Sequence, residues 1–275
     1  MLLHRILTAV PLALAVIWLI LYQPTANLLF VLIPVSFVCG HEWARLAGVQ
    51  STLFQFIFAV LLSAFSWFCI SYLLDYVYVL LVLASIWWFA VLYFLKSAKP
   101  ELKVSLFSPA KLLIVFWVVP SAMIAMYVIH GMERGAEWLL YSMMLVWIAD
   151  SGAYFSGKKF GKNKLAPNVS PGKTLEGLWG ALLASSLYSV LAAYYFDMSM
   201  VHSVFLLALS LMLTVMSVVG DLYESFLKRE AGIKDSGRIL PGHGGILDRV
   251  DGVLPVMPLF VVFYDWLIVP VPGLH

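Results

Sequence analysis

The sequence contains little charge and little cysteine. Only 12% of its 275 residues are charged, whereas 63% are hydrophobic. Ordinary soluble domains carry about a quarter charged residues, so this composition excludes that class. The two cysteines, Cys39 and Cys69, lie in apolar runs and provide neither a disulfide framework nor a metal-ligand spacing. The net charge of +2 is small and says little about partners. We expect no nucleic-acid partner.

Long apolar runs dominate the chain instead. A helix crosses a bilayer core of about 30 Å with roughly 20 apolar residues, and about 17 to 25 are tolerated. The sequence therefore predicts an all-α integral membrane protein with about nine transmembrane helices in a single polytopic domain, residues 1–275. The expected spans, of which the first two are short, lie near residues 6–22, 26–40, 52–70, 73–95, 111–130, 136–155, 175–196, 202–220 and 253–270.

The distribution of basic residues predicts the orientation, because Lys and Arg accumulate in short cytoplasmic loops. With nine spans and a cytoplasmic N-terminus, 16 of the 17 basic residues lie inside and only Arg134 lies outside. This asymmetry would not survive one missed span in the middle of the chain. We expect a cytoplasmic N-terminus, an external C-terminus and a multi-pass location in the inner (plasma) membrane.

One polar stretch, Gly220–Gly252, stands between two apolar runs. It holds 11 of the 32 charged residues and seven of the 18 glycines. If the preceding helix continued past Gly220, spacings of i, i+3, i+4, i+7 and i+8 would place five polar residues on one face. These residues are Asp221, Glu224, Ser225, Lys228 and Arg229.

The second half of the stretch adds a Gly-rich turn and a second acidic pair. The turn, residues 242–245, would let backbone N–H groups approach an anion closely. Asp248 and Asp251 are carboxylates three residues apart, with Arg249 between them. This stretch combines acidic side chains that can hold a hard cation, basic side chains that can bind phosphates, and a Gly-rich turn. The combination suits Mg²⁺-assisted phosphoryl or nucleotidyl transfer. The alternative is a solvated loop whose charges only hold it at the membrane surface.

These residues also carry a family resemblance. The pattern Ser225-x-x-Lys228-Arg229, then Lys234-Asp235, then His243-Gly244-Gly245-x-x-Asp248-Arg249-x-Asp251 resembles the signature of phosphatidate cytidylyltransferases, also called CDP-diacylglycerol synthases. The match spans 27 residues. The length and the multi-span layout are similar too, so the resemblance covers essentially the whole chain.

The resemblance implies the reaction and its participants. CTP and phosphatidate would be converted to CDP-diacylglycerol and pyrophosphate at the cytoplasmic face, with Mg²⁺ as cofactor. It leaves open an additional monovalent cation, and it suggests a homodimer in contact with membrane lipids. Oxygen ligands and a triphosphate substrate both favour Mg²⁺ over Zn²⁺.

Residue roles follow from the same pattern. The candidate metal ligands are Asp221, Asp248 and Asp251, with Asp150 as a weaker fourth. The cationic side chains of Lys228, Arg229, Lys234 and Arg249 would neutralise the triphosphate or the lipid phosphate. The candidate substrate-binding residues are Ser225, Lys234, Asp235, His243, Gly244, Gly245, Lys173 and Thr174. Asp235 could also be a metal ligand, and His243 would donate a hydrogen bond to a phosphate or shape the turn.

Two other segments are expected near the same site. Asp150 lies at the inner end of the sixth span, where an acid usually faces a polar cavity or a partner, or else reaches the interface. Residues 170–177 are interpreted as a helix start, with Ser170 as N-cap and Pro171 at the first helical position. Free N–H groups there, beside Lys173, would also suit an anion.

Two other functions fit parts of the sequence. A CTP-dependent kinase of a membrane alcohol such as a polyprenol would use similar residues but would release CDP, whereas a cytidylyltransferase releases pyrophosphate. A transporter should carry its acids near the middle of the membrane at broken helices, whereas nearly all the charge here lies at one face.

Overall fold

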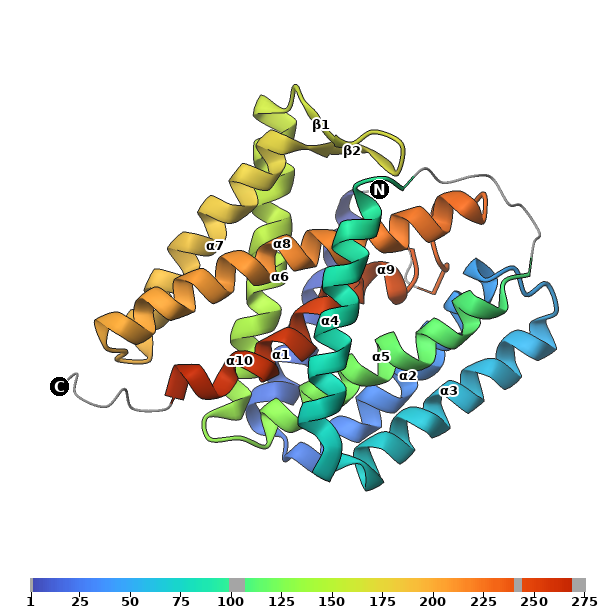
Figure 1. Cartoon of the computed structure of the whole chain (residues 1–275), viewed down its shortest axis with the longest axis horizontal. Helices are drawn as coiled ribbons and strands as arrows, with labels where there is room; N and C mark the ends of the chain where they lie inside the picture. The colour runs from blue at the N-terminus through green and yellow to red at the C-terminus, as the bar shows by residue number, and fades with distance from the viewer. Residues whose placement is uncertain (1, 99–106, 240–243, 269–275) are drawn as a thin grey trace.

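The computed structural model describes residues 2–98, 107–239 and 244–268, and in these ranges the chain is almost entirely helical (Figure 1). The long helices are α1 (Leu2–Tyr22), α2 (Thr25–Leu46), α3 (Thr52–Tyr72), α4 (Val77–Leu95), α5 (Pro109–His130), α6 (Gly135–Phe160), α7 (Leu175–Tyr195), α8 (Met200–Glu230) and α10 (Val253–Ile268). The shorter elements are a 3₁₀ turn (Leu74–Tyr76), the strands β1 (Lys164–Ala166) and β2 (Ser170–Thr174), and helix α9 (Leu247–Val250).

A long helix overlaps each of the nine predicted spans, of which the last extends to residue 270, beyond the described residues. Among the described residues, seven helices are both long enough and apolar enough to cross a membrane. Helix α6 is not one of them, and the described part of α1 contributes a shorter apolar stretch, Ala13–Tyr22. An all-α, multi-pass membrane protein is thus confirmed, whereas nine crossings stay a prediction. Helix α2 is longer than expected, because it continues to Leu46 instead of ending near residue 40.

Helix α10 forms the centre of the bundle. It packs against α4, α5, α6 and α8, and it runs through the middle of the view in Figure 1. Val256, Met257, Leu259 and Phe260 are fully buried in it. The segment between α8 and α10 is therefore attached at both ends to well-packed helices.

Helices α6 and α7 approach each other closely because glycines face each other. A Cβ atom on Gly152 would lie 2.7 Å from the Gly180 carbonyl oxygen and 2.9 Å from the Ala184 Cβ. A Cβ atom on Gly180 would overlap the side chain of Ser156. Small residues at such contacts let helix backbones approach in a membrane, where the hydrophobic effect does not drive helices together.

The segment between α6 and α7 forms an antiparallel hairpin, in which Lys164 pairs with Thr174 and Ala166 with Ser170. The predicted helix start at Ser170 is therefore wrong. Helix α7 begins at Leu175, and its N-cap is Thr174, whose hydroxyl accepts a hydrogen bond from Gly177 N at 3.1 Å. Pro171 is compatible with the strand because a hairpin edge does not need every backbone N–H group.

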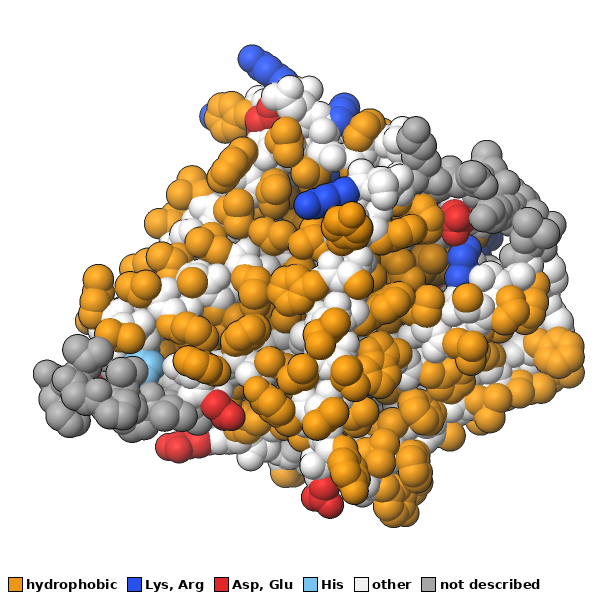
Figure 2. Space-filling model, viewed as in Figure 1, with side chains coloured by type: hydrophobic (Ala, Val, Ile, Leu, Met, Phe, Trp, Pro, Cys, Tyr) orange, Lys and Arg blue, Asp and Glu red, His pale blue; other side chains and the backbone are white. Residues whose placement is uncertain are grey.

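Hydrophobic side chains cover most of the face shown in Figure 2. On this face the Lys and Arg side chains lie in the upper half, towards the hairpin side of the bundle in Figure 1. Several acidic side chains lie at the lower edge instead. A lipid-facing middle with basic residues towards one end is typical of a multi-pass membrane protein.

The close contact between α6 and α7 can be tested with one methyl group. We expect Gly180→Ala to lower the free energy of unfolding by about 1–3 kcal/mol, because overpacking forces backbone shifts. Gly172→Ala is the matched control, because a Cβ atom there would meet nothing within 4 Å. Thermal unfolding in detergent measures both, and equal midpoints for the two variants would contradict the close contact.

Candidate active site

The last three turns of α8 carry two polar rows, which face different neighbours. Asp221, Ser225 and Arg229, each four residues apart, face the hairpin. The Lys173 Nζ atom lies 2.6 Å from Asp221 Oδ2, and Arg229 Nε donates to the Val169 carbonyl at 3.4 Å. Ser225 Oγ donates to Asp221 Oδ1 at 3.3 Å. The helix does continue past Gly220, as the residue spacing required.

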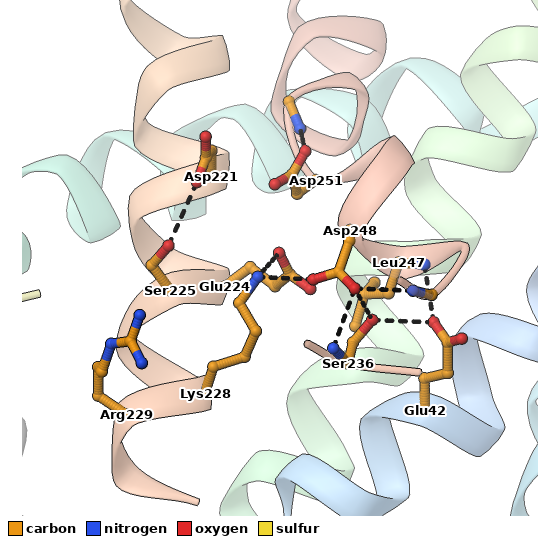
Figure 3. Close-up of polar contacts among 12 residues, drawn as sticks. Glu42, Asp221, Glu224, Ser225, Lys228, Arg229, Ser236, Leu247, Asp248 and Asp251 are labelled. Carbon is orange, nitrogen blue, oxygen red and sulfur yellow. Dashed lines mark hydrogen bonds and ion pairs between the residues drawn. The ribbon is translucent and has the colours of Figure 1, made fainter. Parts of the chain in front are cut away.

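Lys228 belongs to the second row and joins α8 to α9 (Figure 3). Its ammonium group donates to Glu224 Oε2 at 2.7 Å and to Asp248 Oδ1 at 2.6 Å. The three side chains are largely buried, with exposed fractions of 10% for Lys228, 3% for Glu224 and 7% for Asp248. Buried charges need such partners, because each would otherwise lose its hydration without compensation.

The second oxygen of Asp248 binds the preceding loop. Asp248 Oδ2 accepts hydrogen bonds from Ser236 N at 3.0 Å, from Ser236 Oγ at 2.9 Å and from Gly245 N at 2.8 Å. Gly244 beside it has φ = +82°, a backbone conformation that favours glycine. Both oxygens of Asp248 are thus bound by donors of the chain itself.

Three other acids face a separate region. Asp150 of α6, Asp221 of α8 and Asp251 after α9 are close enough to act on one another electrostatically, and the charge of Lys173 acts on both Asp150 and Asp251. In Figure 3, Asp221 and Asp251 lie across from each other beyond the Lys228 network. The charge of Arg249 also acts on Asp150.

A cavity of about 440 Å³ opens between α6, α7, α8 and the hairpin. This volume lies in the range of small-molecule sites, about 300–1,000 Å³. Its lining combines charge with apolar surface. The lining residues are Asp150, Ala153, Tyr154, Gly157, Lys158, Leu165, Gly172, Lys173, Thr174, Gly177, Leu178, Val218 and Asp221.

Glu176 fixes the hairpin that brings Lys173 to the cavity. Its carboxylate accepts hydrogen bonds from Lys162 N at 3.0 Å, from Asn163 N at 3.2 Å and from Asn163 Nδ2 at 2.8 Å. Thr174 ends the hairpin and begins α7 in one residue. The lysine that precedes this cap is therefore directed at the acids of α6 and α8.

The carboxylate oxygens near the cavity are of the kind that binds a hard divalent cation. Within the described ranges, no three acidic, histidine or cysteine side chains are close enough to enclose a metal ion as they stand. Asp150, Asp221 and Asp251 nevertheless supply the carboxylate oxygens that Mg²⁺ prefers. The ammonium of Lys173 already lies against one of them, so this acidic cluster attracts positive charge.

The structure brings together most of the residues that the sequence singled out. Asp150, Lys173, Thr174 and Asp221 line the cavity. Asp248, Lys228 and Gly245 form the buried network next to it, whereas Lys234 and Asp235 are exposed in the loop after α8. His243 lies outside the described residues.

Comparison with known proteins assigns the family. The sequence model of the cytidylyltransferase family matches residues 3–267. The chain belongs to the cytidylyltransferase family. It is 34% identical over 288 residues to the phosphatidate cytidylyltransferase of Haemophilus influenzae, an alignment that covers 98% of this chain and all of that protein. It is also 46% identical over 134 residues to the phosphatidate cytidylyltransferase of Staphylococcus aureus, covering 49% of this chain and 51% of that protein.

Glu42, a buried acid of this cytidylyltransferase, was not among the residues singled out from the sequence. Glu42 of α2 is 1% exposed, and its carboxylate contacts the turn that precedes α9. The available signal was an acid within an apolar helix, which is costly and usually has a partner. The partner could not be identified from the sequence, because it lies 194 to 205 residues away.

The Lys228 network of this cytidylyltransferase should dominate local stability. Lys228→Met would leave Glu224 and Asp248 facing each other without the cation, and Glu224 Oε1 already has no hydrogen-bond partner among the described residues. Breaking one side of a buried ion pair costs about 3–5 kcal/mol. We expect a large fall in the unfolding midpoint in detergent.

Glu137→Gln provides the comparison for Lys228→Met. It removes the acid of an exposed ion pair, in which the Glu137 side chain is 32% exposed and the Arg134 side chain 41%. Such pairs contribute about 0–1 kcal/mol. If Lys228→Met unfolded at the same temperature as Glu137→Gln, the buried bridge would not be a stabilising contact.

Proposed function

We propose that this chain transfers the cytidylyl group of CTP to phosphatidate, giving CDP-diacylglycerol and pyrophosphate. The observation that carries the proposal is its 34% identity to a phosphatidate cytidylyltransferase over 98% of the chain. The structure adds a cavity where basic and acidic side chains meet at the end of apolar helices. That arrangement suits a reaction between a soluble triphosphate and a lipid phosphate.

The chemistry needs alignment more than proton transfer. An oxygen of the phosphatidate phosphate attacks the α-phosphorus of CTP in line, and the bond to the bridging oxygen breaks as pyrophosphate leaves. A phosphate monoester has a second pKa near 6, so it is already largely dianionic at pH 7 and needs little help from a base. The protein therefore has to hold two anions together and balance their charge.

The cationic side chains near the cavity provide that balance. Lys173 lies among the acids of α6 and α8, and Arg249 follows Asp248 on α9. Arg249 is exposed, so its guanidinium can bind two phosphate oxygens at once. Lys228 is held by Glu224 and Asp248, so it sets the position of α9 relative to α8.

Asp150, Asp221 and Asp251 are the residues that would hold Mg²⁺. When bound, the cation supplies positive charge to the phosphate oxygens of the substrate. The three carboxylates come from three different elements, so their separation depends on how α6, α8 and α9 pack. Asp248 contributes indirectly, because its oxygens fix Lys228 and the preceding loop.

The chain would place this site at the cytoplasmic face of the plasma membrane. Nine crossings with the N-terminus inside leave only one basic residue, Arg134, outside. The hairpin and the end of α8 lie on one side of the bundle, whereas the α7–α8 connection lies on the other (Figure 1). The homodimer that the family resemblance suggests stays a prediction.

The reaction is tested with purified protein in detergent, phosphatidate, Mg²⁺ and CTP labelled at either the α- or the γ-phosphate. We expect the label of α-labelled CTP to enter the lipid. The label of γ-labelled CTP should leave in pyrophosphate, so the lipid should stay unlabelled. Transfer of the γ label would instead make the protein a kinase. No transfer of either label, with a folded sample, would contradict both.

The metal assignment is tested by comparing three aspartates. We expect Asp221→Asn and Asp251→Asn to raise the half-saturating Mg²⁺ concentration at least about tenfold, because each removes a ligand charge. Asp248→Asn should also lose turnover, but it should lower the unfolding midpoint because it releases Lys228. An unchanged Mg²⁺ requirement in the first two variants would refute the ligand set.

A further inference from the structure

Glu42 is a residue of α2 whose buried carboxylate is bound by the loop and turn that precede α9. It accepts hydrogen bonds from Ser236 Oγ at 3.1 Å, from Ile246 N at 3.2 Å and from Leu247 N at 2.8 Å (Figure 3). We propose that Glu42 is a positioning residue for cytidylyl transfer, acting through this turn on Asp248 and α9. The inference rests on the proposed function, and it gives a role to a residue outside the signature stretch.

Helix α2 presents Glu42 from a fixed position. The next residue, Trp43, is 1% exposed and donates from Nε1 to the Lys111 carbonyl at 2.8 Å. Its ring packs 6.3 Å from the ring of Tyr223 on α8. On the other side, a Cβ atom on Gly40 would lie 3.0 Å from Leu62 Cδ2, so α2 and α3 are in close contact. The backbone that carries Glu42 cannot shift without moving these packed helices.

Two glycines of the loop leave space for this carboxylate. A Cβ atom on Gly237 or on Gly245 would overlap the carboxylate oxygens of Glu42. Neither glycine has a positive φ, in contrast to Gly244 at +82°. Glycine is therefore needed at positions 237 and 245 for space, and at position 244 for its backbone conformation.

The last residue of the Gly-rich turn and the two residues after it donate to carboxylates of the protein itself. The N–H group of Gly245 donates to Asp248, and those of Ile246 and Leu247 donate to Glu42. These three consecutive donors are used internally, so the turn does not offer them to a substrate phosphate in this arrangement. Ser236 links the two acids, because its hydroxyl lies within hydrogen-bond distance of both.

The route from Glu42 to the cavity is short. Leu247, which binds Glu42, is followed directly by Asp248, Arg249 and, after one more residue, Asp251. Asp248 binds Lys228, and Arg249 and Asp251 act electrostatically on the acids of the cavity. Loss of the Glu42 carboxylate would release the start of α9 and change the separation of these groups.

The first test compares Glu42→Gln with Glu230→Gln in kinetics. Gln keeps the shape of Glu but loses the charge and one acceptor, so we expect kcat to fall about 10- to 100-fold, with the KM for CTP changed less than about threefold. Glu230→Gln also removes a buried acid, which pairs with Lys111 at 2.8 Å and does not touch the turn, and its kcat should stay close to wild type. Equal kcat values in the two variants would overturn the proposal.

The second test reads the loop without using the reaction. Lys234 and Arg238 are exposed, so trypsin can report how firmly the loop is held. We expect faster cleavage after these residues in Glu42→Gln than in wild type or Glu230→Gln, at a temperature where all three stay folded. Unchanged cleavage would refute the positioning role. Because cleavage by trypsin needs no turnover, this test shows whether Glu42 holds the loop even if cytidylyl transfer itself is not observed.

The third test is a double-mutant cycle with Gly237→Ala and Glu42→Ala. It does not use Glu42→Gln, so it can still be carried out if that variant folds poorly. Gly237→Ala keeps Glu42 but adds a methyl group where its carboxylate lies, so we expect faster cleavage and a kcat at least about tenfold lower. In a Glu42→Ala background the overlap with the carboxylate is gone and the nearest remaining atom to the methyl group is Gly245 Cα at 3.0 Å, so the further loss should be clearly smaller than in wild type. Independent, multiplicative effects of the two substitutions would contradict the contact between residues 42 and 237.

Discussion

The structure around the site depends on one constraint: buried acids must find positive charge or hydrogen-bond donors within the protein. Glu42, Glu224 and Asp248 lie together at the end of the bundle, and Lys228 supplies one positive charge for the last two. Backbone N–H groups and Ser236 supply the remaining donors. Because a buried charge without partners is costly, the loop has to adopt the shape that delivers those donors.

This constraint separates the polar residues into two groups with different roles. The buried network around Lys228 has its polar atoms largely bound to one another and holds α2, α8 and α9 together. The groups around the cavity, such as Asp150 and Lys173, remain accessible and carry charge that a substrate or cation can use. Helix α9 belongs to both groups, because Asp248 faces the network while Arg249 is exposed. The polar residues of the stretch Gly220–Gly252 thus divide into a buried network around Lys228 and a second set, such as Asp221, that faces the cavity.

The sequence was sufficient for the features that depend on local patterns. Apolar runs located every long helix, and the spacing of the five polar residues from Asp221 to Arg229 required the helix to continue past Gly220, as α8 does. Local sequence patterns failed where contacts between distant residues determine the structure. Ser170 and Pro171 resemble a helix start, but pairing of residues 164–166 with 170–174 makes that segment a strand. Glu42 has no local feature that identifies its partners, because the turn it binds is more than 190 residues away.

The end of the Gly-rich turn shows how backbone N–H groups can serve carboxylates of the same protein. Such N–H groups suit an anion, and those of Gly245 and Leu247 donate to Asp248 and Glu42, which are side chains of the same protein. Gly157 and Gly177 present the opposite case: both lie at the contact of α6 with α7 and also line the cavity. A Cβ atom on Gly177 would lie 3.0 Å from the Ala153 carbonyl oxygen, and one on Gly157 would lie 3.1 Å from the Thr174 hydroxyl, so close packing and an open site favour the same residue type. The glycines of this enzyme are therefore distinguished by what lies opposite them, which is a carboxylate at position 237 and a second glycine at position 157.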